Sequence, residues 1–477
     1  MSFASPLFLW VFLPVVLSTI LAAPRHWRNG IIAVASLIFY AVGAGATTLL
    51  LLVTIALNYV VGQWLEPDEW ALATRRKRTL LITVICFDVG SLVVWKYLGF
   101  MTEQLNGLAH VLGGDFPVTH LALPIGISFY TFHNISYVFD IYRGERPALR
   151  NPVSFVTYIS MFPQLVAGPI VRYREIADQL PQERTHRLDD IAAGFPRFAL
   201  GLCKKVIVAD SLNPLVNACF ATPGDKMTFA IAWLGAVTYT LQLYFDFSGY
   251  SDMAIGLGRM LGFRLPENFA RPYSSVTVTE FWRRWHMSLS RWFRDYVYIP
   301  LGGNRHGAAK TYRNLITVFA LTGFWHGANW TFLVWGLYHG ALLIIERGFH
   351  LDESPPTRDR RLPRRTLTLL LVIVGWVLFR ATDLPQALTM IGHMLLPDFT
   401  GLTDIVAEAF TNQRLVILLC ALAIVFLPAH PVTGPLLESS RSKPANALRV
   451  TIMTAGLLYA AILVATGTFS PFLYYQF

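Results

Sequence analysis

The sequence predicts an all-α protein that crosses a membrane several times, and three observations support this fold class. Of its 477 residues, 54% are hydrophobic and only 14% are charged, against roughly 25% charged residues in an ordinary soluble domain. The mean hydropathy is +0.47. Apolar runs recur along the chain, and several approach the ~20 residues that a membrane-spanning helix needs. We therefore expect a polytopic membrane protein.

The apolar runs predict the spanning helices in order. The first run follows only the five residues MSFAS, which lack the basic stretch of a secretory signal, so we expect it to be retained as a helix. Two further passages are expected between residues 30 and 64, with a break near Gly43 and Gly45. Several runs are shorter than a full span, which predicts tilt or burial among other helices. The five clearest runs are 6–22, 79–98, 366–379, 415–427 and 450–466.

The net charge of +10 is better explained by membrane topology than by nucleic-acid binding, because the basic residues lie in short loops between apolar runs. With the N-terminus outside, the four main basic clusters would all face the cytoplasm, and the chain would end at Phe477 on the outer face. These clusters lie at 25–28, 75–78, 358–365 and 441–443. The aromatic tail 471–477 is expected to dock an external partner, or else to be a simple interfacial anchor.

We expect one membrane domain over residues 1–477, since no repeat of fixed period and no low-complexity tract divides the chain. The four cysteines form no CxxC pair and are interpreted as packing residues. Two segments favour helices at the membrane surface. Residues 183–212 mix basic and apolar side chains. On one helix over 280–296, Trp285 and His286 would share a face; a Trp and Arg belt with a satisfied core histidine is the alternative.

Two histidines occur in the apolar segment TGFWHGANWTFLVWGLYHG, residues 322–340. Each imidazole there must find a hydrogen-bond partner or cost stability, so both are candidate functional groups. On a continuous helix, the 13-residue step from His326 to His339 means ~20 Å of rise and ~220° of rotation, which argues against an adjacent pair. His326 has small glycines on both sides and Asn329 nearby. His339 is interpreted as structural or supporting.

The residue patterns exclude two common chemistries. No HExxH, HxxE or Cys/His cluster has metal-ligand spacing, so we expect no metal site. The stretch FDFSGYSD does not match the GxSxG elbow of serine hydrolases. A buried, uncharged imidazole suits a general base that takes a proton from an attacking hydroxyl. The sequence therefore indicates acyl transfer.

Several motifs together resemble those of a known family. FWRRWH at 281–286, followed about forty residues later by GFWHGANWT at 323–331, is similar to the paired signature of the membrane-bound O-acyltransferase family, MBOAT. Other segments, such as LPIGISFYTFHNISYVFDIYRGE and YFDFSGYSDMAIGLGRMLGF, resemble its bacterial polysaccharide branch, which contains the integral-membrane subunits of alginate O-acetyltransferases. The resemblance extends from the first helix to the last residue.

The resemblance implies a fold and a site. The fold would be a ring of about 11 tilted transmembrane helices, with interfacial helices, around a central tunnel. His326 matches the active-site histidine and would be the general base, while His286 would hydrogen-bond or polarise the thioester carbonyl. Basic residues on both sides of the motif would place His326 near the inner end of a hairpin, deep in the membrane. Four further residues would line the tunnel or support the histidines: Trp285, Trp325, Asn329 and His339.

The resemblance also implies substrates and partners. Acetyl-CoA would be the cytoplasmic donor, with no permanently bound cofactor, and acetyl groups would cross the bacterial inner membrane to a secreted, alginate-like polysaccharide. An extracytoplasmic SGNH-type acetyltransferase is the expected partner, because the chain has no GDS motif of its own. Transfer of D-alanyl or another acyl group to a cell-wall polymer is an alternative. A polysaccharide exporter is the rival of another class, although the membrane carboxylates show no paired spacing.

Overall fold

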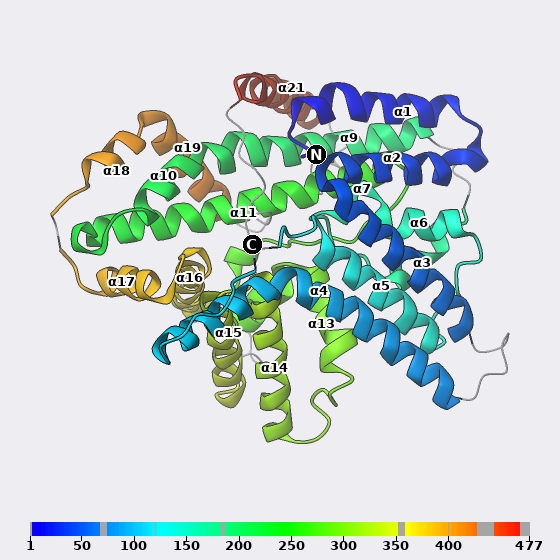
Figure 1. Cartoon of the computed structure of the whole chain (residues 1–477). Helices are drawn as coiled ribbons and strands as arrows, with labels where there is room; N and C mark the ends of the chain where they lie inside the picture. The colour runs from blue at the N-terminus through cyan, green and yellow to red at the C-terminus, as the bar shows by residue number, and fades with distance from the viewer. Residues whose placement is uncertain are drawn as a thin grey trace. The chain divides into compact units, whose positions relative to one another are not determined.

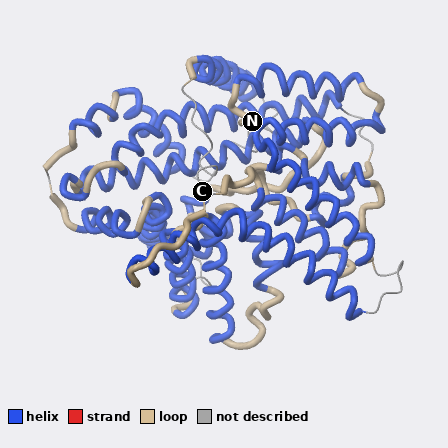
Figure 2. The backbone as a smooth tube through the Cα atoms, in the orientation of Figure 1, coloured by secondary structure: helices blue, strands red, loops and turns tan. Residues whose placement is uncertain are grey.

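The computed structural model describes residues 2–66, 74–119, 121–182, 187–351, 358–398, 400–426 and 443–467. Throughout these ranges the secondary structure consists of helices, turns and loops, with no strand (Figure 2). The expected all-α class is therefore confirmed. The aromatic tail at 471–477, the chain end at Phe477 and the loop residues 441–442 lie outside the described residues, so the predictions made for them stay predictions.

The described chain divides into two compact units, of which the first contains residues Leu7–Phe195 and Ala254–Pro266. It begins with a short π-helical turn, Phe8–Phe12, that continues into α1. Its helices are α1 (Leu13–Ala22), α2 (Arg28–Ala44), α3 (Thr48–Leu65), α4 (Thr74–Val111), α5 (Ile127–Tyr142), α6 (Pro152–Ser160), α7 (Phe162–Leu165) and α8 (Tyr173–Ile176). Figure 1 shows α1 and α2 in dark blue, running side by side. α5 is the central helix, because nearly all of its side chains are buried and it packs against α3 and α4.

The break expected near residue 45 is present. Gly45 ends α2 with φ of 55°, in the left-handed region that glycine adopts without a Cβ clash. α3 begins three residues later at Thr48. Among the described residues, three helical stretches are long and apolar enough to cross a membrane: 25–65, which includes this break, 75–111 and 361–380. Shorter apolar helices occur at 8–22, 412–426 and 453–465.

The second unit contains residues 2–6, Pro196–Met253 and Glu267–Phe477. Its helices are the end of α9 (Arg187–Cys203), α10 (Ser211–Phe220), most of α11 (Phe229–Met260), α12 (Val278–Arg284), α13 (Met287–Phe293), α14 (Ala308–His326), α15 (Trp330–Gly348), α16 (Arg358–Arg380), α17 (Leu384–Leu395), α18 (Asp404–Ala409), α19 (Asn412–Phe426) and α21 (Lys443–Ala465). α14 and α15 form the most extensive helix pair and lie side by side in Figure 1.

The segment after α9 departs from the surface helix expected over 183–212. Lys205 is only 1% exposed, and its ammonium group lies 2.6 Å from Asp210 and 2.7 Å from Asp246. The neighbouring Lys204 binds Asp252 at 2.5 Å. Lys205 can be buried, and Lys204 partly so, because carboxylates on the same segment and on α11 compensate their charge. The basic residues of this segment thus serve packing as well as any surface contact.

Candidate active site

His326 lies at the turn of a helical hairpin. It is the last residue of α14, and the chain then becomes extended at Gly327, with φ of −166°. Asn329 caps α15, because its side-chain oxygen accepts a hydrogen bond from the Thr331 amide at 3.0 Å. The expected hairpin is therefore confirmed. The chain reverses direction between His326 and His339, so the two histidines lie on different helices.

Glycines let the two helices of the hairpin come close. A Cβ at Gly323 would stand 3.2 Å from the Cα of Gly336, and it would also clash with the Phe332 carbonyl. A Cβ at Gly336 would clash with the carbonyl of Phe319 on α14. Without a side chain, each of these glycines permits close backbone approach. It holds the end of α14 firmly against α15.

Aromatic rings surround the His326 imidazole, which is 4% exposed. The centroid of its ring lies 4.8 Å from that of Trp325, 5.1 Å from that of Trp335 and 5.1 Å from that of Phe379. Trp335 comes from α15 and Phe379 from α16. The hairpin and α16 together therefore place His326 in a buried, largely apolar environment.

His286 lies at a break where the sequence pattern predicts one continuous helix over 280–296. α12 ends at Arg284, Trp285 is extended, and His286 has φ of 44° and ψ of 53° before α13 begins. A left-handed conformation is uncommon for a non-glycine residue and is maintained only by surrounding contacts. The helix prediction is wrong here. The shared helical face for Trp285 and His286 is therefore absent.

Asn268 supplies the contacts that maintain this break. Its backbone carbonyl accepts the Met287 amide at 2.9 Å. Its side-chain oxygen accepts the Ser288 amide at 3.2 Å and the Ser288 hydroxyl at 2.9 Å. Its side-chain nitrogen donates to Ser251 on α11 at 3.1 Å. Asn268 is fully buried, so it joins α11, the loop after it and α13 around His286.

The same asparagine defines the tautomer of His286. The Asn268 Oδ1 atom lies 3.2 Å from Nδ1 of the ring, and it is an acceptor because the Ser288 amide donates to it. Nδ1 therefore carries the hydrogen, and Nε2 of the neutral ring accepts hydrogen bonds. His286 lies in a short segment outside the candidate membrane spans. Burial lowers its pKa to about 3, because a low-dielectric environment disfavours the charged ring.

The structure brings the two predicted catalytic histidines to the same aromatic cluster. The centroid of the Trp325 ring lies 6.2 Å from that of His286 and 4.8 Å from that of His326. Phe247 of α11 packs edge-on against His286, with centroids 4.6 Å apart. Trp325 thus contacts both imidazoles, as expected for a residue that lines or supports the site.

His339 contacts the cluster from the other side of Trp335, with ring centroids 5.2 Å apart. Its Nδ1 atom accepts a hydrogen bond from the indole of Trp282 at 3.4 Å. It is fully buried, and its Nε2 atom faces Gly375 of α16, where an added Cβ would come within 2.6 Å. His339 therefore packs α12 and α16 against α15, in keeping with a structural or supporting part.

The two remaining candidates have mainly structural contacts. Besides capping α15, Asn329 donates from its side-chain nitrogen to the Thr382 carbonyl at 2.9 Å. Trp285 packs against the rings of Trp376, at 4.8 Å, and Phe269, at 5.0 Å. Both residues hold elements in position around the histidines.

Sequence reasoning missed two positioning residues. Asn268 is 18 positions before His286 and lies outside the FWRRWH motif. The Glu346 carboxylate accepts hydrogen bonds from the backbone amides of Val278, at 2.5 Å, and Thr279, at 2.8 Å. A carboxylate of α15 therefore caps the start of α12. The T-x-x-E pattern of Thr277 and Glu280 is a capping signal that locates the start of α12.

The described part of the chain contains no group of three or more His, Cys, Asp or Glu residues that could hold a metal ion. The residues around the histidines are instead indole, phenyl and amide groups. This arrangement can move a proton and exclude water.

Comparison with known proteins identifies the family. Residues 143–363 match the profile of MBOAT, the membrane-bound O-acyltransferase family. A probable alginate O-acetylase of Azotobacter vinelandii is 43% identical over 100% of both chains. A peptidoglycan O-acetyltransferase of Helicobacter pylori is 35% identical, covering 86% of this chain and 83% of its own. A teichoic acid D-alanyltransferase of Bacillus subtilis is 29% identical over 54% of this chain and 67% of its own. The profile contains both candidate histidines, and the chain belongs to the membrane-bound O-acyltransferase family as an O-acyltransferase.

Proposed function

We propose that this protein transfers acetyl groups from cytoplasmic acetyl-CoA across the inner membrane, for the O-acetylation of a secreted, alginate-like polysaccharide. The observation that carries the proposal is the pair of buried imidazoles, His286 and His326, in contact with one indole ring. The names of the relatives support it. Full-length matches are to probable alginate O-acetylases, and a further O-acetyltransferase acts on peptidoglycan. Two teichoic acid D-alanyltransferases are similar over about half of this chain.

In the proposed reaction His326 is the general base. It takes the proton of the attacking hydroxyl while the oxygen bonds to the thioester carbonyl carbon. The C–S bond then breaks, and the proton passes from His326 to the departing sulfur, so that CoA leaves as a thiol and the acceptor as an ester. Protons and electrons balance without another reactant. The surrounding aromatic rings exclude water, which limits hydrolysis of the thioester.

The role that we propose for His286 follows from its tautomer. With its hydrogen on Nδ1 and directed to Asn268, the neutral ring offers Nε2 as an acceptor. Polarising the carbonyl, the role expected from the resemblance, would require a second proton on this ring. We infer that His286 accepts a hydrogen bond from the attacking hydroxyl and orients it, while His326 removes the proton.

The direction of transfer completes the proposal. The chain works as one membrane domain in the bacterial inner membrane, with its basic loops in the cytoplasm and its C-terminus in the periplasm. An SGNH-type partner outside the membrane places the acetyl group on the polymer, and the tail at 471–477 contributes to docking it. Deletion of residues 472–477 should leave membrane insertion intact and reduce polymer acetylation. Unchanged acetylation would make the tail a simple anchor.

The main test is acetyl transfer from labelled acetyl-CoA in membranes that contain the protein and its partner. His326→Ala should still insert and still bind acetyl-CoA, while transfer falls by ~10² to 10⁴. His339→Gln is the matched control, because His339 is also buried and also packs on Trp335. It should lose much less. Near-normal transfer by folded His326→Ala would overturn the assignment of the base.

Two further arms separate the alternatives. His286→Asn should keep more activity than His286→Ala, because an amide oxygen can still accept a hydrogen bond from the hydroxyl. Equal loss in both variants would contradict the orienting role. Replacing acetyl-CoA by a D-alanyl carrier should give no transfer. A wild-type protein that exports polymer but releases no CoA would instead be a transporter.

A further inference from the structure

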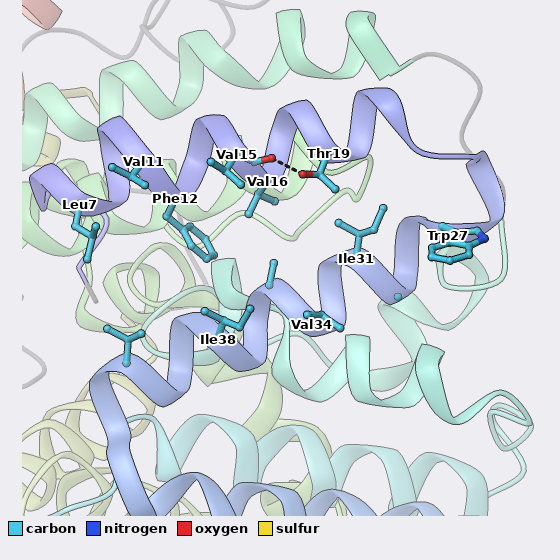
Figure 3. A pocket seen from close by; sticks show the side chains of 13 residues that line it. Leu7, Val11, Phe12, Val15, Val16, Thr19, Trp27, Ile31, Val34 and Ile38 are labelled. Carbon is cyan, nitrogen blue, oxygen red and sulfur yellow. Dashed lines mark hydrogen bonds between the residues drawn. The ribbon is translucent and has the colours of Figure 1, made fainter.

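An apolar groove lies between the first two helices of the first unit (Figure 3). Its volume is about 700 Å³. One wall is the π-helical turn with α1, and the other is α2. Leu7, Val11, Val15, Val34 and Ile38 all line it, and each is at least 50% exposed. Helix α2 is part of a candidate membrane span, so these side chains would face the hydrocarbon core of the bilayer.

Along most of their length the groove walls are apolar. The lining side chains with a polar group are Thr19, whose hydroxyl donates to the Val15 carbonyl at 2.7 Å, and Trp27, whose indole lies at one end of the groove (Figure 3). From Leu7 to Thr19, at ~1.5 Å of rise per residue, the groove is ~18 Å long. This length is close to the ~15 Å thickness of one hydrocarbon leaflet. A single extended acyl chain fits these dimensions and this chemistry.

Cationic groups gather at the α1–α2 connection, which is also the Thr19 and Trp27 end of the groove (Figure 3). A second cavity, of about 650 Å³, is lined there by Arg25 and Arg187, together with the acidic side chain of Asp189. Arg187 uses one nitrogen on the carbonyls that end α1, at 2.5 Å from Ile20 and 2.7 Å from Ala23.

Of the two arginines that line this cavity, Arg25 is the one whose guanidinium makes no hydrogen bond within the described residues. It is exposed, and within the part of the chain that the structure describes no carboxylate pairs with it. The positive end of α2 begins three residues later. Trp27, 61% exposed, is at the same end, where an indole is suited to the headgroup region of a bilayer.

We propose that this groove binds one anionic phospholipid, with an acyl chain along α1 and α2 and its phosphate at Arg25. Charge complementarity selects an anionic lipid over a zwitterionic one. The apolar length selects a membrane lipid over a soluble phosphate. If Arg25 faces the cytoplasm as proposed, the lipid comes from the cytoplasmic leaflet.

The test is native mass spectrometry of the whole detergent-purified protein, titrated with phosphatidylglycerol or phosphatidylcholine. The wild type should retain one phosphatidylglycerol molecule in preference to phosphatidylcholine. Arg25→Gln should lower that retention about fivefold and remove the preference, since one cation near a lipid surface contributes about this factor. Val34→Trp should fill the groove and lower retention of both lipids.

Matched controls are available on neighbouring helices. Val53 of α3 is 53% exposed, against 59% for Val34, so Val53→Trp adds the same bulk outside the groove. Arg75→Gln removes an exposed arginine elsewhere in the same unit. Both controls should retain phosphatidylglycerol as the wild type does. Equal retention by all variants, or by the two lipids, would overturn the proposal. A wild-type dimer that Val34→Trp dissociates would show that a second chain occupies the groove instead.

Discussion

Replacement of Asn268 by alanine should separate a positioning effect on His286 from a general loss of stability. The Asn268 side chain accepts two hydrogen bonds from Ser288, contacts Nδ1 of His286 and donates to Ser251. Asn268→Ala leaves the Ser288 amide and the His286 ring N–H buried without this acceptor. At ~1–3 kcal/mol for each of the two orphaned donors, we expect a loss of about 2–6 kcal/mol of stability.

The same substitution removes the contacts that hold His286 in its left-handed conformation. The ring can then rotate away from Trp325, and a displacement of about 1 Å at a reacting group can lower a rate ~10²-fold. We therefore expect acetyl transfer per folded molecule to fall about 100-fold in Asn268→Ala. The assay is transfer from labelled acetyl-CoA in membranes, normalised to the amount of folded protein.

Asn314 is the matched control for this experiment. It is 1% exposed, and its side-chain nitrogen donates to the carbonyls of Leu301 and Gly303 at 3.2 and 2.9 Å. Asn314→Ala should cost comparable stability, because it also leaves buried polar groups unpaired. It should not change transfer per folded molecule. Equal transfer rates per folded molecule in Asn268→Ala and Asn314→Ala would refute the proposal that Asn268 positions His286.

Three further predictions concern packing, buried charge and topology. Gly336→Ala should lower the thermal midpoint by the equivalent of about 1–3 kcal/mol, because the added methyl clashes with α14. Gly392→Ala, where a Cβ meets open space, should be neutral or slightly stabilising, so equal midpoints would contradict this reasoning. Lys205→Met should destabilise the protein by about 3–5 kcal/mol in denaturant unfolding, because two buried carboxylates lose their cation. In a variant without the native cysteines, an impermeant thiol reagent should label Phe477→Cys in intact cells and Arg361→Cys only after permeabilisation; the opposite pattern would invert the topology.

Much of the fold could be predicted because the signals are local. Apolar runs locate α4, α16 and α19, and a glycine marks the break after α2. The hairpin turn after His326 also has local signals, an extended glycine and the capping Asn329. These features depend on residues within a few positions of each other, where side-chain size and hydrogen bonding act directly.

The break at His286 could not be predicted in this way. Periodicity over 280–296 favours one helix, since each side chain there has an acceptable helical position. The interruption comes from Asn268, whose hydrogen bonds to Met287 and Ser288 replace those of a continuing helix. Contacts over 18 to 20 positions leave no trace in a helical pattern. The catalytic assignment depends on this tertiary contact, because it determines which nitrogen of His286 carries hydrogen.

The Glu346 carboxylate gives the two histidine-bearing segments a common anchor. α15 begins just after the His326 turn and carries Glu346 about 24 Å further along its axis. There the carboxylate accepts hydrogen bonds from the first amides of α12, and the other end of α12 is followed closely by His286. Glu346 thus joins α15 to α12. His326 lies shortly before the start of α15, and His286 lies shortly after the end of α12. The separation of the two imidazoles therefore depends on the lengths of α15 and α12 as well as on the loop contacts that Asn268 makes at His286.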